Sequence, residues 1–175
     1  MKTPKWKIIL IIVLASLVAL ITTLVCWIKL SHNWKPKPYE RIELEQPADI
    51  AKNVPKSDLK HLVDKLVNTP HFYAEKGKRM QNWGYSQILF RRVVINSTLY
   101  GEDYVVTYTH ELMHLKYWCE NETYTSYKTF VALYESGNEI LRNVAERYAY
   151  DVVTIGSFEG TEYDIGFYVL KYLNK

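Results

Sequence analysis

The sequence predicts an α+β fold behind a single N-terminal transmembrane helix. Three observations indicate this: a charge-free apolar run near the N-terminus, one segment rich in β-branched residues, and several segments of helical periodicity around it. Helices and strands that do not alternate regularly are typical of α+β domains rather than of parallel βαβ folds. With 175 residues, the chain is long enough for one domain and an appendage.

Residues 8–28 read IILIIVLASLVALITTLVCWI and contain no charged residue, proline or glycine. As a helix rising 1.5 Å per residue, this segment is about 31 Å long, which matches a bilayer core of about 30 Å. It is longer than the apolar part of a cleavable signal peptide, about 7–15 residues, and no small-residue cleavage site follows it. We therefore predict a retained membrane anchor at residues 8–28.

Charge is distributed unevenly along the chain. Residues 1–39 carry six lysines and no acid, whereas the remainder carries 16 basic and 19 acidic residues. The domain is therefore acidic, which argues against a nucleic-acid partner. The lysines on the two sides of the span nearly balance, but a short basic tail such as residues 1–7 usually stays inside. We predict a single-pass protein with a cytoplasmic N-terminus and the C-terminal domain outside.

Residues 29–56 contain four prolines, which forbid a continuous helix and predict an extended stalk between the membrane and the domain. The folded domain is predicted at residues 57–175. Its first helix begins at Ser57 and ends before Pro70, because apolar residues recur there at helical spacing. Residues 71–87 carry mixed signals, and residues 88–99 predict one or two strands. Further helices are predicted at about 103–118, 124–134, 138–153 and 162–173.

The predicted helix at 103–118 carries the motif His-Glu-Leu-Met-His at residues 110–114. Residues four apart lie about 40° apart on a helix, so His110 and His114 can bind one metal ion. Glu111 points about 100° away from His110, where it can act as a base on a metal-bound water. The alternative is a chance match on a surface helix, but the neighbours of the motif are uncharged except Lys116.

The stretch RVVINSTLYGEDYVVTYTHELMH resembles the zincin metallopeptidases, in which a strand and a short break precede a helix bearing HExxH. The resemblance implies a minimal zincin-like domain that binds one Zn²⁺ ion and hydrolyses a peptide or protein substrate, with Glu111 as general base. It also implies a substrate-binding edge strand within 93–99. The residues expected to form this edge are Val93, Val94, Ile95, Asn96 and Ser97.

The third zinc ligand is expected to be a glutamate. No histidine follows His114, and position 120 is Glu120, so the zincin branch with a third histidine is excluded. The resemblance is therefore to the gluzincins, which take a glutamate from a later helix. We expect Glu146 as this ligand, because it lies in mid-helix between two alanines, with Glu139 as the alternative.

Three other acidic or thiol groups are candidate ligands or neighbours of the site. Glu135 precedes Ser136-Gly137 and suits a solvated turn. Asp151 either holds a ligating histidine through a hydrogen bond or is an ordinary surface carboxylate. Cys119 lies five residues after His114 and points about 140° away from it on a helix, so we interpret it as a small buried residue.

The predicted function is a membrane-anchored zinc metallopeptidase. Two other classes remain open on the sequence: a zinc-binding membrane sensor or regulatory module, and a metal-free envelope interaction protein with an accidental motif.

Overall fold

The computed structural model describes residues 5–77, 80–156, 161 and 164–175. The chain divides into two units, Met1–Trp34 and Lys35–Lys175, which we describe separately. The structure is of the α+β class, with six α-helices and one three-stranded sheet in the described residues. This confirms the predicted fold class.

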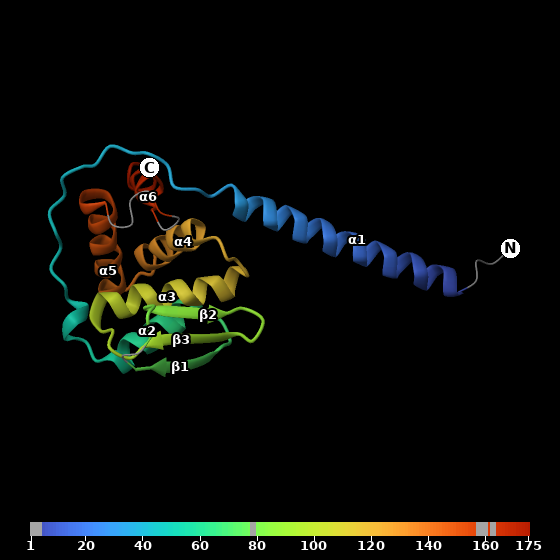
Figure 1. Cartoon of the computed structure of the whole chain (residues 1–175), viewed down its shortest axis with the longest axis horizontal. Coiled ribbons are helices and arrows are strands. Elements are labelled where there is room, and N and C mark those ends of the chain that lie inside the picture. The colour runs from blue at the N-terminus through green and yellow to red at the C-terminus, as the bar shows by residue number, and fades with distance from the viewer. Residues whose placement is uncertain (1–4, 78–79, 157–160, 162–163) are drawn as a thin grey trace. The chain divides into compact units, whose positions relative to one another are not determined.

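The first unit is the helix α1, Lys5–His32 (Figure 1). Its segment Lys5–Leu24 is long and apolar enough to cross a membrane, and none of it is buried within the structure. A single apolar helix near an N-terminus is compatible with a membrane anchor, as the sequence predicted.

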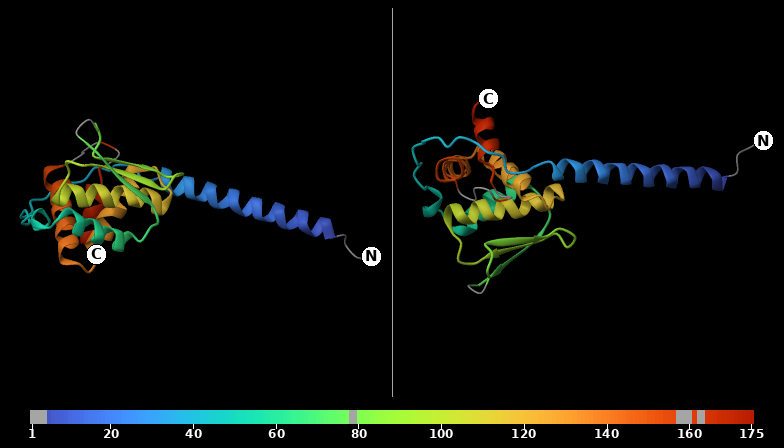
Figure 2. Two further views of the ribbon diagram at one scale, coloured as in Figure 1. Left: turned by 90° about the horizontal axis from the view of Figure 1, so that it is seen from below. Right: turned by 45° about the horizontal axis from the view of Figure 1, so that its top comes forward.

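One helix, α3 (Gly101–Tyr117), lies at the centre of the second unit. It lies between the sheet and the C-terminal helices (Figures 1 and 2). Eleven of its 17 residues are buried, since it packs on its neighbours from several directions. The other elements are η1 (Ala51–Asn53), α2 (Lys56–Val67), α4 (Glu122–Tyr134), α5 (Glu139–Tyr150), the π-helical turn η2 (Asp151–Ile155) and α6 (Gly166–Leu173). The start of the last helix was expected at Glu162, which lies outside the described residues.

The sheet has the strand order β1-β3-β2, with β1 at Phe72–Lys76, β2 at Gly84–Gln87 and β3 at Arg92–Asn96. Strand β3 pairs in parallel with β1 and antiparallel with β2. The prediction that Val93–Ser97 forms the substrate edge is therefore wrong. Val93, Val94 and Ile95 are fully buried because their strand is central, Asn96 ends it, and Ser97 lies beyond it. The edge strand beside α3 is β2, from the region whose sequence carried mixed signals.

Residues 35–50 have no helix or strand, as the prolines predicted, but they do not form a free stalk. This segment, which we call the strap, lies on α5, η2 and α6. The Tyr39 hydroxyl donates to the carbonyl of Val152, and the Ile42 amide donates to that of Val153 over 3.4 Å. A Cβ atom at Gly166 would lie 2.1 Å from the Tyr39 ring, so only glycine leaves room for it.

Candidate metal centre

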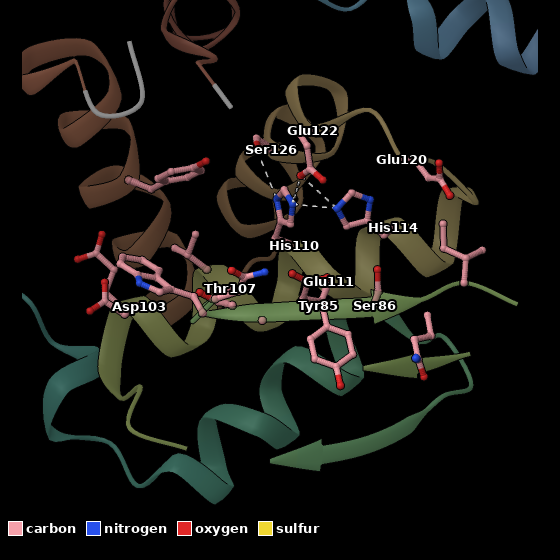
Figure 3. A pocket seen from close by; sticks show the side chains of 18 of the residues that line it. Tyr85, Ser86, Asp103, Thr107, His110, Glu111, His114, Glu120, Glu122 and Ser126 are labelled. Carbon is pink, nitrogen blue, oxygen red and sulfur yellow. Dashed lines mark hydrogen bonds and ion pairs between the residues drawn. The ribbon is translucent and has the colours of Figure 1, made fainter. Parts of the chain in front are cut away.

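The two motif histidines face each other as their spacing predicted. The Nε2 atoms of His110 and His114 lie 3.0 Å apart on the last turns of α3 (Figure 3). Helix α3 ends at Trp118, whose left-handed backbone (φ 50°) reverses the chain. The Asn121 side chain then caps α4 by accepting a hydrogen bond from the Tyr124 amide over 2.8 Å. This tight connection brings the first turn of α4 beside the histidines.

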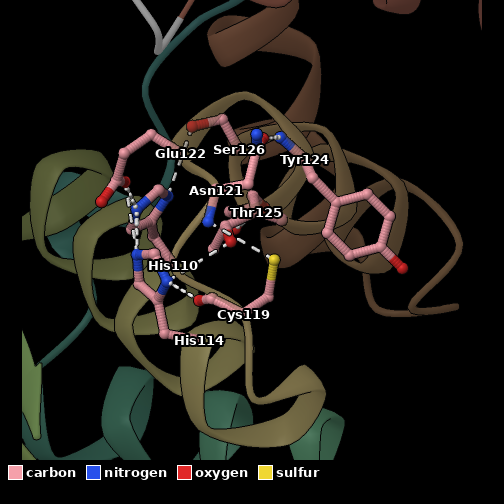
Figure 4. Close-up of polar contacts among 9 residues, drawn as sticks. His110, His114, Cys119, Asn121, Glu122, Tyr124, Thr125 and Ser126 are labelled. Atoms are coloured by element: carbon pink, nitrogen blue, oxygen red, sulfur yellow. Dashed lines mark hydrogen bonds and ion pairs between the residues drawn. The ribbon is translucent and has the colours of Figure 1, made fainter. Parts of the chain in front are cut away.

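Glu122, the first residue of α4, supplies a third donor atom. Its Oε2 atom lies 2.8 Å from Nε2 of His110 and 3.3 Å from Nε2 of His114 (Figures 3 and 4). In a tetrahedral zinc site with bonds of about 2.0–2.1 Å, neighbouring donor atoms lie about 3.3 Å apart. The observed separations are close to this value, and His110, His114 and Glu122 together can hold a metal ion.

The outer nitrogens of the two rings are also engaged (Figure 4). Nδ1 of His114 contacts the carbonyl oxygen of Cys119, and Nδ1 of His110 lies 3.4 Å from the Ser126 hydroxyl. A carbonyl oxygen can only accept, so Nδ1 of His114 carries the proton and Nε2 is the nitrogen that can bind a metal. Cys119 is 1% exposed, as expected, and reaches His114 through its carbonyl oxygen.

The pKa values of Glu122 and His114 depend on one another. Burial alone would raise the pKa of Glu122, but hydrogen bonds and attraction from His110 and His114 lower it to about 2. Burial would lower the pKa of His114, yet its bond to Glu122 leaves that pKa raised. Glu122 is therefore an anion, as a carboxylate ligand of a metal must be. Its negative charge stabilises positive charge at the two histidines.

Glu111 lies on the face of α3 that is turned toward β2 (Figure 3). It is 8% exposed and accepts a hydrogen bond from the Ser86 hydroxyl. Burial raises the pKa of its carboxyl group, and the positive charge of the two histidines partly opposes this shift. A carboxylate with a raised pKa next to the three candidate metal ligands is suited to taking up a proton.

These residues lie in a cleft of about 930 Å³ bounded by β2, the β2–β3 loop, α3, α4 and α5. Gly84 permits this arrangement, because a Cβ atom there would lie 2.8 Å from the Thr107 methyl group and 3.0 Å from Cγ of Glu111. Among the residues that the structure describes, the charged ones that line the cleft, apart from the histidines, are acidic. They are Glu102, Asp103, Glu111, Glu120, Glu122 and Asp151.

The structure does not bring the expected third ligand to the histidines. Glu146 lies on α5 with its carboxylate 3.3 Å from Nε of Arg142, and its side chain is 42% exposed. The alternative, Glu139, is exposed at the start of α5, and Glu135 accepts a hydrogen bond from the Tyr172 hydroxyl. Asp151 lines the cleft. The carbonyl oxygen of Cys119 and the Thr125 hydroxyl contact Nδ1 of His114, and the Ser126 hydroxyl contacts Nδ1 of His110.

Sequence reasoning missed Glu122 because it expected the next helix to begin at residue 124 and considered only the later glutamates Glu135, Glu139 and Glu146. A signal was present: Asn121 is a favourable helix cap, and it follows α3 after a very short connection. Two helices joined in this way meet at their adjoining ends, so an acidic residue in the first turn of the second helix lies beside His114.

Comparisons of the chain with protein-family models, with curated proteins and with solved structures found no match.

Proposed function

We propose that the chain is a membrane-anchored zinc metallopeptidase. The observation that carries this proposal is the cluster of Nε2 of His110, Nε2 of His114 and Oε2 of Glu122, with the buried carboxylate of Glu111 beside it. Two imidazoles and one carboxylate suit zinc, and a catalytic zinc site has three protein ligands and one open position.

Glu111 is the general base in this proposal. When bound, zinc would lower the pKa of a coordinated water toward about 7 and polarise the scissile carbonyl. Glu111 takes the proton from the attacking water and passes it to the leaving amine. Its hydrogen bond with Ser86 holds the carboxylate toward the cleft side of α3. Such a base contributes about 10²–10⁴-fold to the rate.

Strand β2 is suited to binding the substrate main chain. In the described part of the chain it pairs with a strand, β3, along one edge only, and residues Gly84–Gln87 line the cleft that contains the histidines. A peptide in an extended conformation can add to a free strand edge through main-chain hydrogen bonds. This role replaces the one that the sequence assigned to Val93–Ser97. The acidic lining of the cleft favours peptides with basic residues.

Tyr148 is a second group that faces the cleft from α5. Burial raises the pKa of its hydroxyl to about 12, so it stays protonated at neutral pH and can donate a hydrogen bond. We assign it the role of a donor to the oxygen that becomes negative during hydrolysis.

The helix α1 is the membrane anchor in this proposal, with the N-terminus inside and the domain outside. Its apolar segment supports the anchor, and the short basic tail supports the orientation.

Substituting Glu111 tests the peptidase chemistry. We expect Glu111→Gln in the purified full-length chain to keep one zinc ion and to lose about 10²–10⁴-fold in hydrolysis of a fluorogenic peptide library. Glu146→Gln is the matched control, because Glu146 is exposed and paired with Arg142. Hydrolysis that survives in Glu111→Gln would refute the assigned mechanism. Zinc binding without hydrolysis by the unsubstituted chain would indicate a zinc-binding regulatory module instead.

A further inference from the structure

One end of the domain presents unusually exposed apolar side chains. Leu89, Phe72 and Phe90 are 81%, 74% and 71% exposed. These fractions exceed that of every large apolar side chain described in α1, where the highest value is 68% at Leu20. Large contiguous apolar surface on a folded domain usually marks a binding site for a protein or a membrane.

The chain holds these side chains outward by backbone hydrogen bonds. In the β2–β3 loop, the Phe90 amide donates to the Gln87 carbonyl and the Arg91 amide to that of Ile88, each over 3.1 Å. The Phe72 amide donates to the Arg91 carbonyl over 2.8 Å, which fixes the start of β1 beside the loop. The exposure of the loop therefore follows from its folded conformation.

Positive charge accompanies the apolar side chains. Arg91 and the exposed Arg92 follow Phe90 directly, and Arg92 is the register partner of Phe72. Helix α3 ends at the same end of the domain as the loop (Figures 1 and 2). Its last turn contains the exposed Lys116, and the exposed Trp118 follows it. The acid Glu120 also belongs to this region. Aromatic and aliphatic side chains flanked by arginine and lysine match the interface of an anionic bilayer.

The connection to α1 limits how far the domain can lie from a membrane. The carbonyl of Lys35 accepts a hydrogen bond from the Tyr168 hydroxyl over 3.0 Å, so the strap is attached to the domain from its first residue. Only residues 33 and 34 separate it from the end of α1, which is a reach of about 7 Å. Along the horizontal axis of Figure 1, the first part of the strap and the β2–β3 loop both lie toward the right, the strap beside α6 and the loop at the tip of the sheet.

We propose that the β2–β3 loop binds the surface of the anionic bilayer in which α1 is anchored. The side chains of Leu89 and Phe90 enter the interface, and Arg92 lies among the lipid headgroups. Ile88, Leu89 and Phe90 also line the cleft, so the cleft opens at the lipid surface. Its substrates are then membrane-proximal segments of other proteins. This inference rests on the anchor within the proposed function and does not require a bound metal.

Depth-dependent fluorescence quenching in nanodiscs tests the proposal with the full-length chain. Phe90→Cys in a Cys26→Ser background is labelled with an environment-sensitive dye, while the buried Cys119 stays unlabelled. Nanodiscs contain a spin-labelled phospholipid, with or without phosphatidylserine. Ile155→Cys is the matched control, because Ile155 is 56% exposed on η2, and Leu14→Cys reports on the span.

With phosphatidylserine, we expect quenching at position 90 to exceed that at position 155 by at least about twofold, and Arg92→Glu to reduce the excess. Equal quenching at positions 90 and 155 would overturn the proposal. A fluorescence change at position 90 that depends on protein concentration or on added peptide, and not on the spin-labelled lipid, would also overturn the proposal. Missing quenching at position 14 would refute the anchor itself. Zinc content is measured on the same samples. A loop that does not bind the membrane is thereby distinguished from a histidine cluster that does not bind zinc.

Discussion

Removing the carboxylate of Glu122 is predicted to weaken zinc binding far more than removing that of Glu146. In the structure, Oε2 of Glu122 lies 2.8 Å and 3.3 Å from the two histidine nitrogens, whereas Glu146 pairs with Arg142. Glu122→Ala leaves two protein ligands. Changing a group that only supports a ligand already costs about 10–100-fold in metal affinity. Losing the ligand itself should therefore cost at least about 100-fold, or about 3 kcal/mol.

The assay is competition for zinc against a chromophoric chelator of known affinity, with the full-length chain in detergent. Glu122→Ala and Glu146→Ala are measured beside the unsubstituted chain. Glu120→Ala is a further control, because Glu120 lines the same cleft and lies only two residues from Glu122. Loss of the negative charge at the first turn of α4 should cost about 0.3–1 kcal/mol of folding stability, and loss of the hydrogen bonds to the histidines about 1–3 kcal/mol more. Circular dichroism verifies that the variant is folded.

Two results would refute this reasoning. Glu122→Ala with unchanged zinc affinity would show that the glutamate is a hydrogen-bond partner of the histidines and not a ligand. A large loss in Glu146→Ala would show that α5 moves to the histidines when zinc binds.

Three other substitutions test the surroundings of the site. Gly84→Ala places a Cβ atom 2.8 Å from the Thr107 methyl group, so thermal unfolding should show a loss of about 1–3 kcal/mol and a lower peptidase rate. Arg147→Ala removes the partner of Glu102, whose side chain is 12% exposed, and the donor to the strap carbonyl of Pro47, which should cost about 3 kcal/mol. Burial, opposed in part by Arg147, raises the pKa of Glu102 from 4.5 to about 7. The folded chain therefore holds a proton that the unfolded chain releases, and the free energy of unfolding should fall between pH 4.5 and 7.

Each of these substitutions has a control. Gly77→Ala should change little, because a Cβ atom there meets nothing within 4 Å. Arg142→Ala breaks an exposed ion pair and should change the stability little. Glu102→Gln should remove part of the slope of stability with pH. Two results would contradict the assigned burial of the pair formed by Glu102 and Arg147. One is an unchanged slope of stability with pH in Glu102→Gln, and the other is an equal loss of stability in Arg147→Ala and Arg142→Ala.

The sequence was sufficient to predict the helix that carries the motif, because spacing along one helix depends only on local geometry. The positions of His110 and His114 follow from their separation of four residues, and Glu111 follows with them. The α+β class and the apolar helix α1 were likewise predictable, since periodicity and composition are local properties. The confirmed features share this local origin.

The missed features depend on contacts between distant segments. Strand β3 has the β-branched composition of any buried strand, and only its pairing with β1 and β2 makes it central. The strap binds the domain through backbone groups, which composition does not reveal. Glu146 borders an apolar stripe of α5, but its carboxylate pairs with Arg142 one turn earlier on the same helix. The short connection after α3 instead places Glu122 beside the histidines. In each case, the tertiary arrangement decided between choices that the sequence alone permitted.

An anomalous difference map at the zinc edge, from crystals of the zinc-loaded chain, tests the metal centre most directly. We predict one peak bonded to Nε2 of His110, Nε2 of His114 and a carboxylate oxygen of Glu122, at about 2.0–2.2 Å from each. A peak elsewhere, a bond to Glu146 in place of Glu122, or no zinc at the two histidines would contradict it.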